Sequence, residues 1–414
     1  MTTPDQAPPR ARNAVSRRGF LGAGATAAAA AAVAGCGPGS PSGKTRTTVG
    51  AASAPAAQQV AFHGAHQAGI VTPQQQHLRF AAFDLKTENR DELADLLRVW
   101  SDTAAGLMAG AARDATGEAR ELAPARLTLT FGLGPGLFAA DRRLGLADRR
   151  PAALAAIPSF GADAFDRRRC DGDLGVQICS DDAQVAFHAF HALSNAARGV
   201  AEPRWLQAGF LGERPSGTTN RNLLGFKDGT RNLDVRDAGT TGAQLWAAAG
   251  DGAPWMAGGT YLVARRVRTV LDVWDATSVA GQEQTIGRRK DTGAPLGGRA
   301  EHDAPDFAAS GPNGPTIPAD AHVRLAAPEH NGGARLLRRG YNYDDGIDAD
   351  TAQVDAGLFF ISFQRDPRRQ FVPIQRRLAA SDALGQHLIH TASAVFACPP
   401  GAAGGGYVGE GLFI

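Results

Sequence analysis

The apolar and polar positions along the chain predict β-strands in both of its halves. Residues 127–132 alternate between apolar and polar side chains, which is the period of a strand, and residues 79–85 and 173–179 have a similar character. In the second half, residues 259–267 and the strongly apolar residues 357–363 predict two more strands. The second half therefore repeats the plan of the first.

Helices are predicted between these strands. Residues 89–109 carry apolar side chains at helical spacing on one face, at Leu93, Leu96, Leu97 and Trp100. A further helix is predicted over residues 183–198, because the acidic stretch before it can cap its start. Residues 269–276, residues 371–380 and the stretch around His387 are also predicted to be helical. Strands and helices in this order predict an α+β fold, with helices packed on antiparallel sheets.

Length and composition agree with such a fold and exclude some classes of protein. The chain has 414 residues, which is long enough for two domains, and 43% of them are hydrophobic and 20% charged, as in an ordinary globular protein. The formal net charge of +2 does not suit a protein that binds nucleic acid. No phosphate-binding glycine motif follows a predicted strand, so nucleotide chemistry has little support.

The N-terminal segment has the features of a targeting signal. Residues 16–21, Ser-Arg-Arg-Gly-Phe-Leu, resemble a twin-arginine signal, and the apolar run that follows ends in Val-Ala-Gly-Cys36, which resembles a lipobox. We interpret residues 1–36 as this signal and residues 37–58 as a flexible tether. The protein is then exported to the periplasm or another extracytoplasmic site, with a membrane tether through lipid on Cys36. The alternative is a cleaved signal with an incidental cysteine.

The other cysteines and the paired histidines do not make a metal site by their spacing. Cys170, Cys179 and Cys398 are an odd number, so they cannot all pair within one chain. A bridge between Cys170 and Cys179 stays open, but we favour buried free thiols. Two histidine pairs are one helical turn apart, and we interpret them as residues on helix faces because further ligands are missing: His188 with His191, and His387 with His390.

One stretch concentrates residues that suit catalysis. Residues 222–232 contain the pattern Gly225-x-x-Asp228-Gly229, in which glycines let the backbone approach a ligand while the carboxylate points into a cavity. Taken alone, the pattern fits an ordinary Asp-Gly turn at the end of a hairpin. Three other motifs accompany it in the chain: Phe62 to Ile70 with two histidines, His322 in H-x-R-x-x-x-P, and Arg338-Arg339-Gly340-Tyr341.

With these four motifs in this order, the chain from about Val60 to its C-terminus resembles the dye-decolourising peroxidases. It is most similar to the twin-arginine-exported branch that includes the deferrochelatase/peroxidase of bacterial iron uptake. The resemblance implies two ferredoxin-like domains, here residues 59–245 and 246–414, with haem b held mainly by the second domain. It also implies a homo-oligomer.

The resemblance assigns roles on the two sides of the haem. His322 corresponds to the axial ligand of the haem iron, and His330 is the alternative. A carboxylate is expected to orient the axial histidine, but the sequence does not identify it. Asp228 corresponds to the acid that moves a proton between the peroxide oxygens. Arg338 corresponds to the cation that stabilises developing charge; Arg339 is its rival, because neighbouring residues on a strand face opposite ways.

The same motif supplies three further cofactor-binding candidates, Gly229, Arg231 and Asn232, which would approach the haem or its propionates. The function implied is a peroxidase that uses hydrogen peroxide to oxidise small organic reductants, such as dyes and phenols, one electron at a time. Two alternatives keep the haem: a deferrochelatase that takes iron out of haem together with iron-uptake components, and a non-catalytic haem-binding lipoprotein. A third is a haem-free α+β binding module.

Overall fold

The computed structural model describes residues 59–110, 122–161, 163–214, 217–349 and 351–414. The predicted signal and tether, residues 1–36 and 37–58, lie outside the described residues, and so does Cys36. Among the residues that the structure describes, none of the helices has the length and apolar character needed to cross a bilayer.

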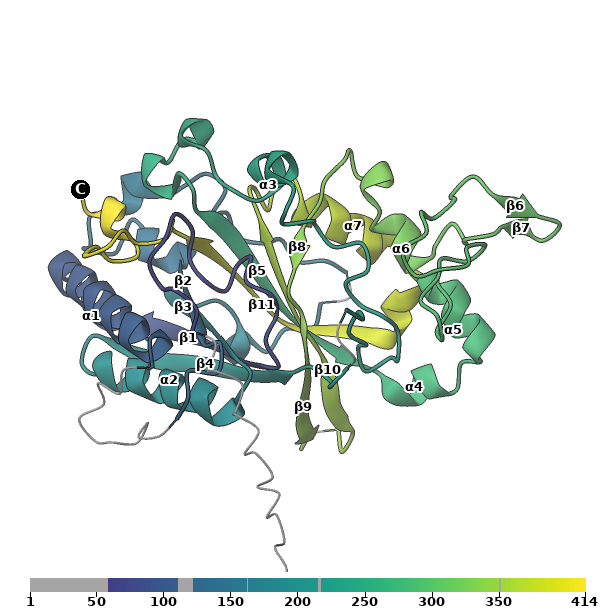
Figure 1. Cartoon of the computed structure of the whole chain (residues 1–414), viewed down its shortest axis with the longest axis horizontal. Helices are drawn as coiled ribbons and strands as arrows, with labels where there is room; N and C mark the ends of the chain where they lie inside the picture. The colour runs from purple at the N-terminus through teal and green to yellow at the C-terminus, as the bar shows by residue number, and fades with distance from the viewer. Residues whose placement is uncertain (1–58, 111–121, 162, 215–216, 350) are drawn as a thin grey trace, which may run out of the picture. The chain divides into compact units, whose positions relative to one another are not determined.

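The first half of the chain is a four-stranded antiparallel sheet with two helices. The strands lie in the order β2-β3-β1-β4. Helices α1 and α2 lie against each other on one face of this sheet (Figure 1). The elements are β1 (His77–Leu85), α1 (Arg90–Met108), β2 (Thr128–Leu133), β3 (Leu174–Ser180), α2 (Ala183–Ala196) and β4 (Ala201–Phe210).

Local sequence explains where the two helices begin. The side chain of Asn89 accepts a hydrogen bond from the backbone N–H of Asp91, and Asp182 accepts from Gln184 and Val185 at the start of α2. The apolar face predicted for α1 is buried, with Leu93, Leu96, Leu97 and Trp100 in the core. The strands and helices predicted for the first half are therefore confirmed, while β4 was not predicted.

The second half repeats the topology of the first. Its four long strands lie in the order β9-β10-β5-β11, which is again second, third, first and fourth along that half when the two-residue strands β6, β7 and β8 are left out. The elements are β5 (Thr260–Thr269), α4 (Leu271–Asp275), α5 (Val279–Ile286), β6 (Ser310–Gly311), β7 (Gly314–Pro315), α6 (His322–Leu325), β8 (Leu337–Arg338), β9 (Tyr341–Ile347), β10 (Val354–Gln364), α7 (Phe371–Ser381) and β11 (Leu388–Cys398). The predicted α+β fold of two ferredoxin-like halves is confirmed.

One expectation for the second half is wrong in part. The predicted helix around His387 is a single stretch of 3₁₀-helix, Ala383–His387, and the chain then continues directly as β11. Ten residues of β11 pair with β5, and that pairing between distant segments decides the structure here. The histidines His387 and His390 are therefore not a pair on a helix face, whereas His188 and His191 do lie on α2.

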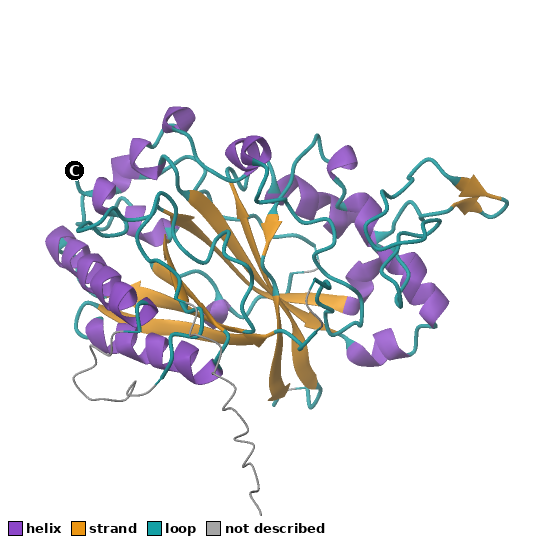
Figure 2. Ribbon diagram, in the orientation of Figure 1, coloured by secondary structure: helices purple, strands orange, loops and turns teal. Residues whose placement is uncertain are grey.

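The two halves are joined through single strand contacts. Phe210 at the end of β4 pairs with Asn342 in β9, and Ala397 in β11 pairs with Leu133 in β2. These contacts and the pairing of β5 with β10 combine the halves into one nine-stranded sheet that closes on itself, and the short β8 pairs with β10. The connection between the halves contains α3 (Ala238–Gln244), and Figure 2 shows the β6–β7 hairpin projecting beyond the helices of the second half.

The described cysteines behave as the sequence analysis favoured. Cys170, Cys179 and Cys398 are free and buried. Burial raises the pKa of all three thiols, so none of them is poised as a thiolate.

Candidate active site

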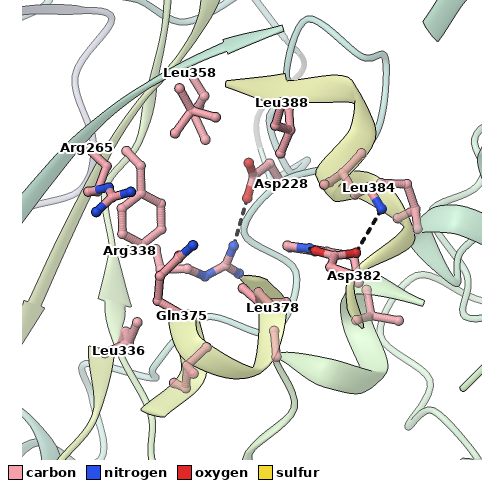
Figure 3. Close-up of a pocket in the computed structure, with 18 of the residues that line it drawn as sticks. Asp228, Arg265, Leu336, Arg338, Leu358, Gln375, Leu378, Asp382, Leu384 and Leu388 are labelled. Atoms are coloured by element: carbon pink, nitrogen blue, oxygen red, sulfur yellow. Dashed lines mark hydrogen bonds and ion pairs between the residues drawn. The ribbon is translucent and has the colours of Figure 1, made fainter. Parts of the chain in front are cut away.

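A cavity of about 480 Å³ lies in the second half of the chain (Figure 3). Strands β5 and β10 and helices α6 and α7 line it. Phe160 and Asp163, from the loop before β3, also line it, so the first half contributes to the site. The cavity brings together all of the predicted site residues except Asn232: His322, Asp228, Gly229, Arg231 and Arg338.

Asp228 projects from a turn that needs its glycines. Gly225 and Gly229 have φ angles of +84° and +125°, in a region that favours glycine. A Cβ atom on Gly225 would also lie 2.7 Å from the side chain of Lys290. The Asp228 N–H donates to the carbonyl of Asn220 at 2.8 Å, and this hydrogen bond holds the turn in place. The carboxylate is therefore presented to the cavity by a rigid loop.

Arg338 reaches the same carboxylate. Its Nη1 donates to Asp228 Oδ1 at 2.8 Å (Figure 3). The side chains of Arg338 and Asp228 are 32% and 29% exposed, so both remain open to the cavity. Arg339 lies elsewhere: its guanidinium is buried and donates to the carbonyl of Thr72 and to the side chain of Gln75. Of the two neighbouring arginines, only Arg338 lines the cavity.

His322 faces the cavity from α6 and is oriented by Asp382. Its Nδ1 lies 2.7 Å from Asp382 Oδ2, and because a carboxylate can only accept, Nδ1 carries the proton. The ring's Nε2 is then the atom left to coordinate a metal. Burial opposes the charged form of His322, but the carboxylate of Asp382 outweighs this and raises the pKa of the imidazole.

Asp382 is itself held in place. It is 5% exposed, and its Oδ1 accepts the N–H of Leu384 at 2.9 Å (Figure 3). It therefore supplies the orienting carboxylate that the sequence analysis expected but could not name. Sixty residues separate it from His322, and no motif marks the pair in the sequence.

Two other histidines, His330 and His390, lie in surroundings that differ from those of His322. His330 does not line the cavity and packs against Phe307, with ring centroids 5.1 Å apart. His390 does line the cavity, where burial and the nearby Arg265 lower the pKa of its imidazole to about 3. Among the described residues, no group of three or more His, Cys, Asp or Glu side chains could hold a metal ion. A metal at this site would therefore need to bring most of its own ligands, as the iron of haem does.

The walls between these polar groups suit a large planar ligand. Leu358 and Phe360 of β10 and Ile374 and Leu378 of α7 give the cavity apolar surfaces. An imidazole on one wall, and an acid and a cation in the same cavity, complete the donor set that a haem peroxidase requires. The residues present therefore fit haem.

Two glutamates hold the loop that carries Asp228 through ion pairs and hydrogen bonds. The carboxylate of Glu301 accepts hydrogen bonds from Lys227, Thr230 and Thr219, the Thr230 bond being 3.0 Å long. Arg231 donates to Glu329 at 2.8 Å. Glu301 lies in an irregular loop. Its role could not be predicted from the sequence, because no motif around it indicates a contact with the loop that carries Asp228.

The side chain of Asn232 forms hydrogen bonds with the backbone of Arg338. Its Nδ2 donates to the Arg338 carbonyl, and its Oδ1 accepts the Arg338 N–H, both at 2.8 Å. Asn232 therefore does not line the cavity itself, but it binds the backbone of Arg338, which does.

The chain matches two family models, in sequential order. The model described as "Dyp-type peroxidase, N-terminal" matches residues 67–211, and "Dyp-type peroxidase, C-terminal" matches residues 219–403. Among curated relatives, a "Dye-decolorizing peroxidase" of Thermobifida fusca (strain YX) is 41% identical over 374 residues, which cover 86% of each chain. A "Deferrochelatase" of Escherichia coli (strain K12) is 34% identical over 377 residues, which cover 86% of this chain and 88% of the relative.

Solved structures agree with these matches. Ferric DtpA from Streptomyces lividans superposes with a TM-score of 0.81 at 45% identity, over 86% of this chain and 97% of that one. A DyP-type peroxidase from Cellulomonas bogoriensis gives a TM-score of 0.80 at 43% identity, over 87% of this chain and 99% of that one.

Proposed function

The chain belongs to the Dyp-type peroxidase family, whose members are haem-dependent, and from this premise we propose that His322, Asp228 and Arg338 carry its reaction with hydrogen peroxide. The protein is a haem peroxidase that oxidises reducing substrates at the expense of peroxide. The observation that supports the assignment of residues is their meeting in one cavity, with the Asp382–His322 hydrogen bond and the Asp228–Arg338 ion pair.

The residues divide the chemistry between them. When bound, haem supplies the iron at which peroxide is reduced and the ring that stores oxidising equivalents. His322 would hold the group through Nε2, and the hydrogen bond from Nδ1 to Asp382 would make the imidazole a stronger electron donor. Asp228 moves one proton from one oxygen of hydrogen peroxide to the other. Arg338 stabilises the negative charge that builds on the departing oxygen.

The haem is proposed to be haem b. Covalent attachment of a c-type haem uses a C-x-x-C-H motif, and the sequence has none. The described cysteines are buried and do not line the cavity, so they offer no attachment point. Extraction of the pigment into acidified organic solvent tests this, because only a haem without a covalent bond leaves the protein.

Deferrochelatase activity is the second candidate, and it is supported by the 34%-identical relative of that name. The higher identity to the relative named as a dye-decolorizing peroxidase favours the peroxidase function. The two are separated by incubating the haem-loaded protein with reductant and no peroxide. Release of intact protoporphyrin together with iron supports deferrochelatase activity, whereas haem that stays intact excludes it.

Export and tethering are proposed from the N-terminal sequence. The twin arginines Arg17 and Arg18 and the lipobox cysteine Cys36 predict a protein outside the cytoplasm with a lipid anchor. Cys36→Ala should move the protein from the membrane fraction to the soluble fraction. A wild-type protein that is soluble after cell fractionation would contradict the anchor.

The visible spectrum of the haem-loaded protein tests the central proposal. Wild type is expected to show a Soret band and a peroxide-induced change, and His322→Ala is expected to lose or displace the band. An unchanged band in His322→Ala would remove His322 as the axial ligand. The absence of any Soret band in the wild type would contradict haem binding altogether.

A further inference from the structure

Asn232 holds the backbone of Arg338 through both ends of its amide. The Arg338 N–H donates to Asn232 Oδ1 and Asn232 Nδ2 donates to the Arg338 carbonyl, each at 2.8 Å. Asn232 lies 106 positions before Arg338, so this contact is specific to the tertiary structure. Two short hydrogen bonds to one residue restrict both its position and its rotation.

The position of Arg338 in the sheet explains why it needs this contact. Strand β8 has only two residues, and β10 is the one strand to which it is paired among those that the structure describes. The N–H of the next residue, Arg339, donates to Ile361 in β10 at 2.8 Å, so the backbone groups of Arg338 point away from β10. Unpaired backbone groups on the open side of a strand would be satisfied by a further strand if one were present. The amide of Asn232 takes the place of that strand.

The same turn carries Asp228, the partner of the Arg338 side chain. The Asn232 N–H donates to the Gly229 carbonyl at 3.0 Å, which closes the turn. A five-residue segment, residues 228–232, thus engages Arg338 twice: Asp228 binds the guanidinium and Asn232 binds the backbone. The separation between acid and cation therefore depends on one short loop.

We propose that Asn232 is a positioning residue that sets the direction of the Arg338 guanidinium for the reaction with peroxide. This inference rests on the proposed function of Arg338. Without the Asn232 side chain, the two-residue strand keeps its contacts with β10 and Asp228 alone holds the guanidinium, which can then leave the geometry in which it stabilises charge. Misplacement of a catalytic group by about 1 Å lowers a rate by roughly a hundredfold.

The chain provides a matched control in Gln67. The Gln67 side chain makes the same kind of two-bond contact with the backbone of Phe131, accepting at 2.7 Å and donating at 2.9 Å. Gln67 also donates to the carbonyl of Pro399, so its loss removes at least as many hydrogen bonds. Phe131 lies in the core of the first half and has no part in the chemistry. Gln67→Ala therefore reports the effect of losing such a contact on folding alone.

The experiment measures the second-order rate of the haem-loaded protein with hydrogen peroxide, by stopped-flow absorbance, in five proteins: wild type, Asn232→Ala, Arg338→Ala, the double variant and Gln67→Ala. Asn232→Ala is expected to slow this step by about ten- to a hundredfold while the KM for the reductant stays unchanged. Adding Asn232→Ala to Arg338→Ala should have no further effect, because Asn232 acts through Arg338. Gln67→Ala should lower the melting temperature but keep the wild-type rate.

The outcomes separate the inference from the function on which it rests. A wild-type rate in Arg338→Ala contradicts the proposed role of Arg338 itself. A slow Arg338→Ala beside a fast Asn232→Ala overturns the inference alone. Effects of the two substitutions that multiply in the double variant also overturn it, because Asn232 would then act independently of Arg338.

Amide hydrogen exchange gives a readout that does not depend on activity. Because Asn232 accepts the Arg338 N–H, this amide should exchange faster in Asn232→Ala than in wild type, with and without haem. Peptides covering Leu337 to Gly340 report it. Unchanged exchange in that peptide would show that Asn232 does not hold the backbone in solution.

Discussion

Arg338 Nη1 lies 2.8 Å from Asp228 Oδ1, so the acid and the cation in this cavity are in direct contact. Each side chain is about one-third exposed, and an ion pair with that exposure adds little to the free energy of folding. The pair is therefore expected to matter for chemistry more than for stability. Substitution of either residue can be interpreted without a large correction for unfolding.

Asp228→Asn should remove the proton carrier while keeping the shape of the side chain. The rate with hydrogen peroxide is expected to fall by about a hundred- to ten-thousandfold, because the amide cannot take up the proton. The melting temperature should stay close to that of the wild type. Stopped-flow absorbance and a thermal melt measure the two effects, and a rate within twofold of the wild type would exclude Asp228 as the proton carrier.

Arg338→Leu and Arg339→Leu should have opposite consequences. Arg338→Leu is expected to slow the peroxide reaction and leave unfolding nearly unchanged. Arg339→Leu leaves the half-buried carbonyl of Thr72 and the buried side chain of Gln75 without their donor, at about 1–3 kcal/mol of stability, and should not slow the folded protein. Denaturant unfolding and stopped-flow rates test both variants. The reverse pattern would assign the cation role to Arg339.

Asp382→Asn should weaken electron donation by His322. The amide is a poorer acceptor than the carboxylate for the Nδ1–H group, so the imidazole becomes less basic and the reduction potential of the bound haem rises. Spectroelectrochemical titration of wild type and variant measures the shift. A potential that does not change would mean that Asp382 orients the ring without tuning it.

The fold followed from the sequence where local periodicity was strong. The apolar face of α1 predicted both the helix and its buried side, because a nineteen-residue amphipathic segment has one way to bury that face. Strand β4 escaped prediction because exposed polar residues and Pro203 interrupt its pattern. Strand β11 escaped because its long pairing with β5 is a tertiary contact that adjacent residues do not encode.

The candidate site followed from motifs, but its supporting contacts did not. Asp228, His322 and Arg338 stand in recognisable patterns, and the structure places them in one cavity. Asp382 and Glu301 each support one of these elements from a distant loop, with no pattern of their own. Hydrogen bonds between loops depend on the folded path of the chain, so a single sequence does not reveal them.

Glu301 should make stability depend on pH in the acidic range. Burial alone would raise the pKa of its carboxyl, but hydrogen bonds from Lys227, Thr219 and Thr230 outweigh burial and lower it to about 2, from 4.5. A depressed pKa in the folded state contributes stability that is fully present above pH 4.5 and is lost as the pH falls toward 2. Glu301→Gln should therefore be less stable than wild type at neutral pH.

The difference between wild type and Glu301→Gln should shrink as the pH falls below 4.5. Melting temperatures of both proteins across pH 2.5–7 test this. Glu88→Gln is the control, because Glu88 forms an exposed pair with Arg143 that should contribute almost nothing. A constant difference at every pH would show that Glu301 is not held as a carboxylate.

Asp163→Ala should destabilise the protein strongly. Asp163 and Arg265 form an ion pair in which both side chains are only 1% exposed, and removing one partner leaves a buried charge. Such a change typically costs about 3–5 kcal/mol. Replacing both residues by leucine should recover most of the loss. Denaturant unfolding measures this, and a loss below about 1 kcal/mol in Asp163→Ala would mean that water reaches Arg265.

The wall of the cavity extends along the chain from Phe160 to His390, and β11 supplies Leu388 and His390. A ribosome delivers the chain from its N-terminus, so the first half can fold while the second is still being made. The pocket for the cofactor does not exist on the nascent chain until β11 has emerged and paired with β5. If the cavity is the haem site, as proposed, haem should bind only when synthesis of the chain is almost complete, and a product truncated before β11 should not retain it.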